Sequence, residues 1–255
     1  MKSQEQISYK QLNPSPELED FIDSYWEHKN LKDSPNKLTI FPDSFFKLIF
    51  YLVDRKIVAY FLTGLWPKET EIIIPPQATV YGIKFKILAP EYIFQQEIAS
   101  LLNTHIELDL SFWDIDNYKF DDFQLVIDHF ESTIITILAQ NNEVEGKKLQ
   151  LTQLLDKMEG HITAEEVSNQ IVWSNRQINR YLNKYLGVSL KTYLNIQKVY
   201  SSYIQIREGR FHPDKGYFDQ AHFIREVKKH TSKTPKELHK RQHDRFIQLK
   251  NIQKK

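Results

Sequence analysis

The chain has 255 residues, of which 41% are hydrophobic and 26% charged, and its formal net charge is +1. This composition is typical of a soluble globular protein with room for two domains, and it is too apolar for intrinsic disorder. The absence of cysteine excludes disulfide frameworks, thiol nucleophiles, Cys-ligated zinc and iron–sulfur clusters. No apolar run approaches the ~20 residues of a membrane span, and the first ten residues are too polar for a signal peptide. We therefore expect a cytoplasmic protein without a membrane partner.

The charges are divided unequally along the chain. Residues 1–145 carry 12 Lys and Arg and 23 Asp and Glu, a net charge of −11. Residues 146–255 carry 22 Lys and Arg and 10 Asp and Glu, a net charge of +12. An asymmetry of this size indicates two modules, of which the basic one is a candidate for binding a polyanion. The alternative is a basic face that is simply exposed to solvent.

The N-terminal half predicts a helix followed by strands. Residues Pro16 to Lys29 place five apolar side chains at helical spacing, which predicts one amphipathic helix. Residues 37–86 then form short runs rich in Ile, Val, Phe and Tyr, separated by turn residues, which are typical of antiparallel strands. The expected strands are LTIF, FKLIFYLV, IVAYFLTG, TEIIIP and ATVYGIKFKI. The expected fold is α+β, with a small antiparallel β barrel or sandwich flanked by helices.

Helical patterns return after the strands. One begins at Pro90 (PEYIFQQEIASLLN), and a second covers Asp121 to Gln140, where one apolar stripe could pack on the barrel or on a second copy of the chain. The stripe contains Phe123, Val126, Ile127, Phe130, Ile134, Ile137 and Leu138. Residues 141–148 are polar and contain a glycine, so they are the expected linker. The expected domains are a sensor or dimerisation domain over 1–140 and an all-α domain over 149–255.

Two short helices joined by a tight turn are predicted in the basic half. Thr163 with Glu166, and Ser174 with Gln177, form capping boxes, so helices should begin just after Thr163 and Ser174. Gly187 should end the second helix. The side chains expected to be buried are Val167, Ile171, Val172, Ile178, Leu182 and Tyr185. This arrangement is a helix-turn-helix.

The other face of the second helix is polar and contains no acid between Asn175 and Gly187. Arg can donate two hydrogen bonds to guanine and Asn can bond bidentately with adenine, so such a face can read a major groove. The candidate base-reading residues are Asn175, Arg176, Asn179, Arg180 and Asn183. The alternative is a plain basic surface.

Residues 151–241 resemble the DNA-binding domain of AraC/XylS-type transcription regulators. The resemblance rests on LNKYLGVSLKTY at residues 182–193, GYFDQAHFIREVKK at residues 216–229 and the pair Thr234-Pro235. It implies two helix-turn-helix units joined by a long helix, whose recognition helices enter successive major grooves. By position, it implies base contacts by Arg176, Asn179 and Arg180 in the first unit and by Gln220, His222 and Arg225 in the second.

The sequence departs from the family pattern in the second unit. Only six residues, Arg210 to Lys215, stand where the family has the first helix of that unit, and Pro213 would interrupt a helix there. We therefore expect an incomplete unit, whose recognition helix begins after Asp219 and holds phosphates through Arg225, Lys228 and Lys229. Ser232 also replaces a common glycine. The N-terminal half resembles the sensor-like domain of one branch of these regulators, through Phe41-Pro42-Asp43, Gly82 to Phe85 and the tail Asp244 to Leu249.

No residue pattern meets the requirements of a catalytic or metal site. The chain lacks a nucleophile elbow, a His-Glu-x-x-His motif and a glycine-rich phosphate loop. The acidic pairs Asp114/Asp116 and Asp121/Asp122 are typical of turns and helix starts, and His239/His243 flank two cations that would repel a metal. The aromatic residues of the first half could line a pocket or fill the core. They are Tyr51, Tyr60, Phe61, Trp66, Tyr81 and Phe85.

Together, these features predict a sequence-specific DNA-binding transcription regulator that is not an enzyme and has no cofactor or metal. The expected partners are double-stranded DNA, a small-molecule effector in the N-terminal domain, a second copy of the chain and RNA polymerase. A different class of function stays open: a protein-interaction module or anti-activator, in which the incomplete second unit has lost specific DNA binding.

Overall fold

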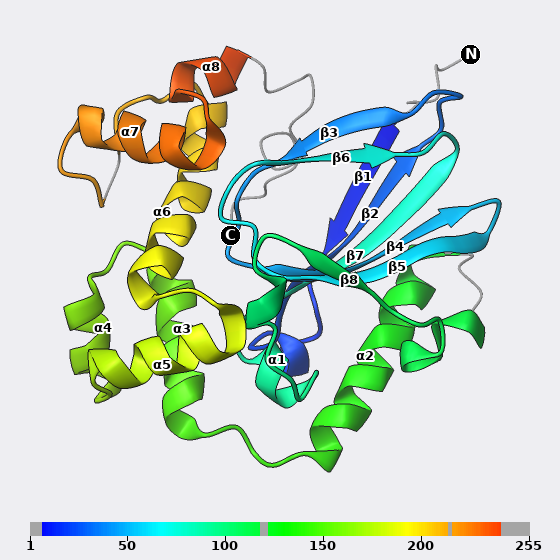
Figure 1. Cartoon of the computed structure of the whole chain (residues 1–255), viewed down its shortest axis with the longest axis horizontal. Helices are drawn as coiled ribbons and strands as arrows, with labels where there is room; N and C mark the ends of the chain where they lie inside the picture. Colours follow the sequence, from blue (N-terminus) through cyan, green and yellow to red (C-terminus); the bar gives the residue numbers. More distant parts are fainter. Residues whose placement is uncertain (1–6, 118–121, 214–215, 241–255) are drawn as a thin grey trace.

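The structure is a computed structural model that describes residues 7–117, 122–213 and 216–240. Its N-terminal half is a sandwich of two antiparallel sheets, and its C-terminal half is helical (Figure 1), which confirms the α+β prediction. The larger sheet has the strand order β1-β2-β7-β4-β5-β8, and β3 and β6 form the smaller sheet. The strands are β1 Ile7–Leu12, β2 Ile22–Asn30, β3 Asn36–Ile40, β4 Phe46–Val53, β5 Lys56–Thr63, β6 Thr70–Ile74, β7 Ala78–Phe85 and β8 His105–Glu107.

All five strands predicted between residues 37 and 86 are present, as β3 to β7. Asp54 and Arg55 both take positive φ in the two-residue loop that joins β4 to β5. Such a turn matches the right-handed twist of the strands that it connects. Almost every residue of β4 is buried, because the smaller sheet covers one face of the larger sheet and helix α2 (Phe123–Gln140) lies against the other.

The helix predicted from Pro16 to Lys29 is wrong. One 3-10 turn, Pro16–Leu18, is followed by β2, which pairs with β1 on one side and β7 on the other. Tyr25 belongs to the core on one face of the sheet, and Trp26 belongs to the core on the other. The same apolar spacing also fits a strand that is buried on both faces. Pairing with β1 and β7 makes this segment a strand and not a helix.

The helix predicted from Pro90 is also largely wrong. Only α1, Ala89–Tyr92, and a 3-10 turn at Ala99–Leu101 are helical in this segment. Gln95 takes a positive φ between them, and the Ile98 N–H donates a hydrogen bond to the Tyr185 carbonyl in the C-terminal half at 3.0 Å. This segment is therefore not a continuous helix, and its end bonds to α5 of the C-terminal half.

The helix predicted at the end of the N-terminal half is confirmed as α2, and the Asp122 side chain caps it by accepting from the Gln124 N–H. Its apolar stripe packs on the larger sheet: the ring centroids of Phe130 and Phe50 are 5.7 Å apart. The sequence left two partners possible for this stripe, the β-sheet domain and a second copy of the chain. In the structure the stripe packs on the sheet. Dimerisation stays a prediction.

Six helices make up the described part of the C-terminal half. They are α3 Gly146–Met158, α4 Ala164–Ile171, α5 Asn175–Leu186, α6 Leu190–Arg207, α7 Gln220–Thr231 and α8 Pro235–Lys240. Helix α3 begins within the expected linker 141–148, and one hydrophobic cluster continues from Leu18 in the sandwich to Leu194 in α6. The division into separate domains therefore stays a prediction. Within the described ranges, no helix is long and apolar enough to cross a membrane.

Gly82 allows Trp26 to pack flat on the sheet. The two residues are cross-strand partners, and a Cβ at Gly82 would overlap the indole ring. We expect Gly82→Ala to displace Trp26 and lower the free energy of unfolding by about 1 to 3 kcal/mol, the usual cost of overpacking. Gly146→Ala is the matched control, because a Cβ there has open space. Urea denaturation measures both, and equal stability of the two variants would contradict this role of Gly82.

Candidate nucleic-acid interface

The predicted helix-turn-helix is present as α4 and α5, and both predicted capping boxes form. The Glu166 N–H donates to the Thr163 hydroxyl at 3.2 Å, and the Glu166 carboxylate accepts from the Thr163 N–H at 2.8 Å. Ser174 and Gln177 make the equivalent pair at the start of α5. These reciprocal bonds satisfy backbone donors that have no partner within the helix. They fix the residues at which both helices begin.

Most of the predicted buried face is confirmed, but Val172 is wrong. Val172 is 75% exposed and ends α4 with a φ of 55°, a conformation that β-branched residues rarely adopt. Helix α4 therefore ends at Ile171, one residue before the last position that the apolar pattern assigned to its buried face. Tyr185 is half-buried, and the remaining residues of the predicted face are buried: Val167, Ile171, Ile178 and Leu182.

The outer face of α5 presents four of the five candidate base readers to solvent. Asn175, Arg176, Arg180 and Asn183 are exposed. Neither Arg176 nor Arg180 forms an ion pair with any residue in the described part of the chain. Their guanidinium groups are therefore available to a partner outside the chain.

Asn179, the fifth candidate, has its side-chain amide engaged within the protein. Its Oδ1 accepts from the Leu190 N–H at 2.9 Å, and its Nδ2 donates to the Asn175 carbonyl at 2.7 Å. Leu190 is the first residue of α6, so Asn179 connects α5 to the next helix. Both atoms of the amide are thus already engaged within the protein, where they hold α5 against the start of α6. A base contact by Asn179 stays a prediction.

The helix predicted as the recognition helix of the second unit is α7. It begins after the predicted cap, where the His222 N–H donates to Asp219 at 2.6 Å. Gln220 and His222 are half-buried. Gln220 donates to the Phe211 carbonyl, and His222 accepts from the Phe218 N–H, both at 3.3 Å. The candidates that stay exposed on α7 are therefore its cations, Arg225, Lys228 and Lys229.

No helix precedes α7 in its unit, as far as residues 208–213 and 216–219 describe it. Tyr217 takes part of that role. Its hydroxyl donates to the Lys198 carbonyl at 3.2 Å, and its ring centroid lies 4.9 Å from that of Phe223 of α7. Phe223 is itself buried in a cluster with Val199 and Tyr203 of α6. The shortened loop thus still holds α7 on α6.

The far end of α7 is anchored to the sandwich. His230 Nδ1 donates to the Pro67 carbonyl at 2.8 Å, and the His230 carbonyl accepts from the Glu69 N–H at 3.2 Å. Lys233 adds an ion pair with Glu69 at 3.6 Å. Ser232 ends α7 with a φ of 55°, so it adopts the conformation usual for the glycine that it replaces. The loop between β5 and β6 therefore fixes α7 relative to the N-terminal half.

Helix α6 separates the two candidate recognition helices. Figure 1 shows α4 and α5 near its beginning and α7 near its end. Its 18 residues span about 27 Å. Successive major grooves on one face of DNA are about 34 Å apart. The length of α6, which separates the two candidate helices, is therefore of the same order as the distance between neighbouring major grooves.

Sequence reasoning missed Phe218, which is 95% exposed directly before the cap of α7. It lies outside the helix, so helical periodicity gave no signal for it.

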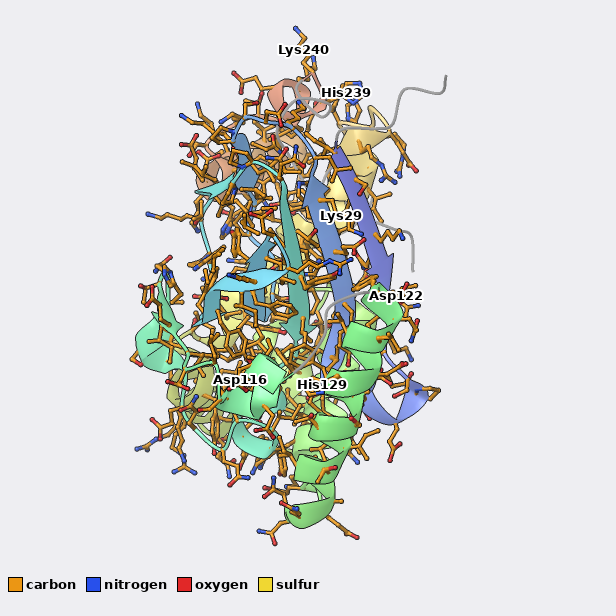
Figure 2. All side chains as sticks on the ribbon, turned by 90° about the vertical axis from the view of Figure 1, so that its right-hand side faces the viewer. Lys29, Asp116, Asp122, His129, His239 and Lys240 are labelled. Atoms are coloured by element: carbon orange, nitrogen blue, oxygen red, sulfur yellow. The ribbon has the colours of Figure 1, made fainter. Side chains whose placement is uncertain are left out.

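The acidic and histidine residues considered for catalysis are dispersed. Figure 2 shows Asp116, in the 3-10 segment Phe112–Asn117, well apart from Asp122 at the start of α2. His239 Nδ1 donates to the Ile206 carbonyl at 3.0 Å. The described residues contain no cluster of three metal-binding side chains. Asp121, His243 and the tail Asp244 to Leu249 lie outside the described residues.

A cavity of about 200 Å³ lies where the sandwich meets α6. Three of the six aromatic residues singled out from sequence line it: Tyr51, Phe61 and Trp66. The other three, Tyr60, Tyr81 and Phe85, belong to the hydrophobic core beneath α2. The sequence left two roles possible for these aromatic residues, lining a pocket or filling the core. Three of them line the cavity, and the other three fill the core.

Comparisons with known proteins give one family match and several structural matches. A family profile described as "Domain of unknown function (DUF6597)" matches residues 10–107. An apo variant of ToxT from Vibrio cholerae has 8% identity and a TM-score of 0.42, covering 92% of this chain and 97% of that chain. Another Vibrio cholerae ToxT structure has 10% identity and a TM-score of 0.41, covering 98% and 100%. A ToxT structure with bound unsaturated fatty acid has 12% identity and a TM-score of 0.37, covering 91% and 93%. No curated protein matches.

The role of Asn179 can be tested by stability. We expect Asn179→Ala to lower the free energy of unfolding by about 1 to 2 kcal/mol, because the Leu190 N–H loses its acceptor. Asn183→Ala is the matched control one turn later, and we expect it to change stability by less than about 0.5 kcal/mol. Thermal and urea denaturation measure both. If Asn179→Ala is as stable as the control and loses only DNA affinity, Asn179 is a base reader.

Proposed function

We propose that this protein is a sequence-specific DNA-binding transcription regulator of the AraC/XylS type. The observation that carries the proposal is the outer face of α5, where Arg176 and Arg180 are exposed on the second helix of a capped helix-turn-helix. In this motif, residues of the first turns reach base edges while the preceding helix crosses the DNA backbone. Arg176, Arg180 and Asn175 are the assigned base readers. Asn183 is not assigned to a base, because its amide already donates to the Asn179 carbonyl at 2.7 Å.

Helix α7 acts as an anchor in this proposal. Arg225, Lys228 and Lys229 are exposed and can neutralise phosphates, which adds affinity without reading sequence. Gln220 and His222 already have partners within the protein, so they are not assigned to bases. Base reading is thus concentrated in the first unit.

The N-terminal half is proposed to regulate this DNA binding. The cavity between the sandwich and α6 is the proposed effector site, because it adjoins the helix that carries both units. A second copy of the chain and RNA polymerase are the further proposed partners, and the proposed compartment is the cytoplasm. The shortened second unit favours one competing function, a protein-interaction module without specific DNA binding.

Selection of bound sequences from a random DNA pool tests the proposal. We expect the full chain to enrich one motif. Arg180→Ala should then weaken binding to the selected site by about 1 to 3 kcal/mol, because the guanine contacts are lost, and hardly change binding to a scrambled site. Lys56→Ala, at an exposed cation directly after the β4–β5 turn, is the matched control and should change neither.

The outcomes separate the two functions. Equal losses of Arg180→Ala on the selected and scrambled sites would remove Arg180 as a base reader. A folded protein that enriches no motif would contradict specific DNA binding and favour the interaction module. Affinities must be compared at one salt concentration, because phosphate contacts make them strongly salt-dependent.

A further inference from the structure

The two most exposed large apolar side chains of the described ranges stand at the starts of the two candidate recognition helices. Phe218 is 95% exposed and Val172 is 75% exposed, whereas the next, Ile73, is 58% exposed. Phe218 directly precedes Asp219, the cap of α7, and Val172 lies just before Trp173 and the cap of α5. Single exposed apolar residues are common on protein surfaces, so exposure alone argues nothing. The position that the two residues share indicates a function.

Val172 is held in a conformation that costs stability. Its φ of 55° is left-handed, and the Cβ of a β-branched residue disfavours this region. Glycine would take the same conformation without strain. The Val172 N–H donates to the Ser168 carbonyl, and its carbonyl accepts from Lys147 Nζ at 2.9 Å, so the backbone is fixed on both sides. A strained backbone that presents an apolar side chain to solvent is typical of a functional position.

Phe218 is also presented from a fixed backbone. Its N–H donates to His222 Nδ1 at 3.3 Å. The preceding residue, Tyr217, packs on Phe223 with 4.9 Å between the ring centroids, and the following residue, Asp219, caps α7. Fixing the backbone in advance lowers the entropy that a side chain loses when it contacts a partner.

The arrangement of the two residues favours DNA over a protein as the partner. Figure 1 shows the α4–α5 turn and the loop before α7 on the side away from the sandwich and well apart from each other. A protein partner usually covers a contiguous apolar centre, whereas the major groove offers single methyl groups at separate base pairs. Exposed cations accompany both positions, Arg176 on α5 and Arg225 on α7.

We propose that Val172 and Phe218 each contact the 5-methyl group of a thymine, Val172 in the groove that α5 enters and Phe218 in the groove that α7 enters. The methyl group marks a T·A pair in the major groove, and apolar side chains recognise it. The inference rests on the proposed function and deepens it. It adds an apolar base contact to the second unit, whose polar candidates Gln220 and His222 already have partners.

Replacement of thymine by uracil tests the contacts on the DNA side. Deoxyuridine pairs with adenine as thymidine does but lacks the 5-methyl group. Each thymine of the site selected from the random pool is replaced singly, and each duplex is titrated with the full chain at one salt concentration. We expect one replacement in each half of the site to weaken binding about three- to fivefold, the effect of uncovering one apolar carbon.

Two variants assign these thymines to the two residues. We expect Phe218→Ser and Val172→Gly each to bind the selected site about three- to tenfold more weakly. Each should lose the discrimination between thymine and uracil at one position, and the position should differ between the variants. Phe218→Leu keeps an apolar side chain and should keep the discrimination. Leu31→Ser is the matched control, because Leu31 is 44% exposed in the loop after β2, and it should change neither quantity.

Several results would overturn the inference and leave the proposed function intact. They are an enriched motif without thymine, uracil duplexes that bind as tightly as the thymine site, and discrimination that either variant keeps in full. A folded chain that enriches no motif would contradict the proposed function, and this inference with it. The uracil scan uses the unmodified protein, so its result does not depend on the folding of any variant.

Discussion

The packing of helix α6 is the constraint on which the other functional features depend. At its start, the Leu190 N–H is bound by Asn179 of α5. Near its end, Tyr203 is buried with Phe223 of α7, and its hydroxyl donates to the Pro42 carbonyl of the sandwich at 3.3 Å. Gln197 in the middle reaches the cavity. One helix therefore positions both candidate recognition helices and carries one wall of the proposed effector site.

Opposite charges contribute to the contact between the two halves of the protein. The acidic and basic halves are joined by a few ion pairs at their contact, such as Lys148 with Glu91 at 2.9 Å and Lys86 with Asp156 at 2.6 Å. Arg176 and Arg180 of α5 take no part in these pairs and are exposed. Their charges are thus not used in the contact between the halves.

The sequence could predict the features that depend on local interactions. The capping boxes at Thr163 and Ser174 are complete within four residues, and the five strands of residues 37–86 are bounded by their own turn residues. It misjudged segments whose structure depends on distant partners. Residues 22–30 form a strand because β1 and β7 pair with them, and residues 93–98 leave the helical conformation to contact α5. The candidate site shows the same division. The exposed face of α5 follows from helical periodicity, but the engagement of Asn179 requires the position of α6, and the cavity residues meet only in the folded protein.

If α6 holds two DNA-binding helices in one rigid arrangement, both should contact the same DNA at a fixed separation. Hydroxyl-radical footprinting of the full chain on its selected site measures this most directly. We expect two protected patches about 10 base pairs apart on one face of the DNA, one for α5 and one for α7. A single protected patch, with the protein folded and α7 intact, would contradict the two-helix arrangement.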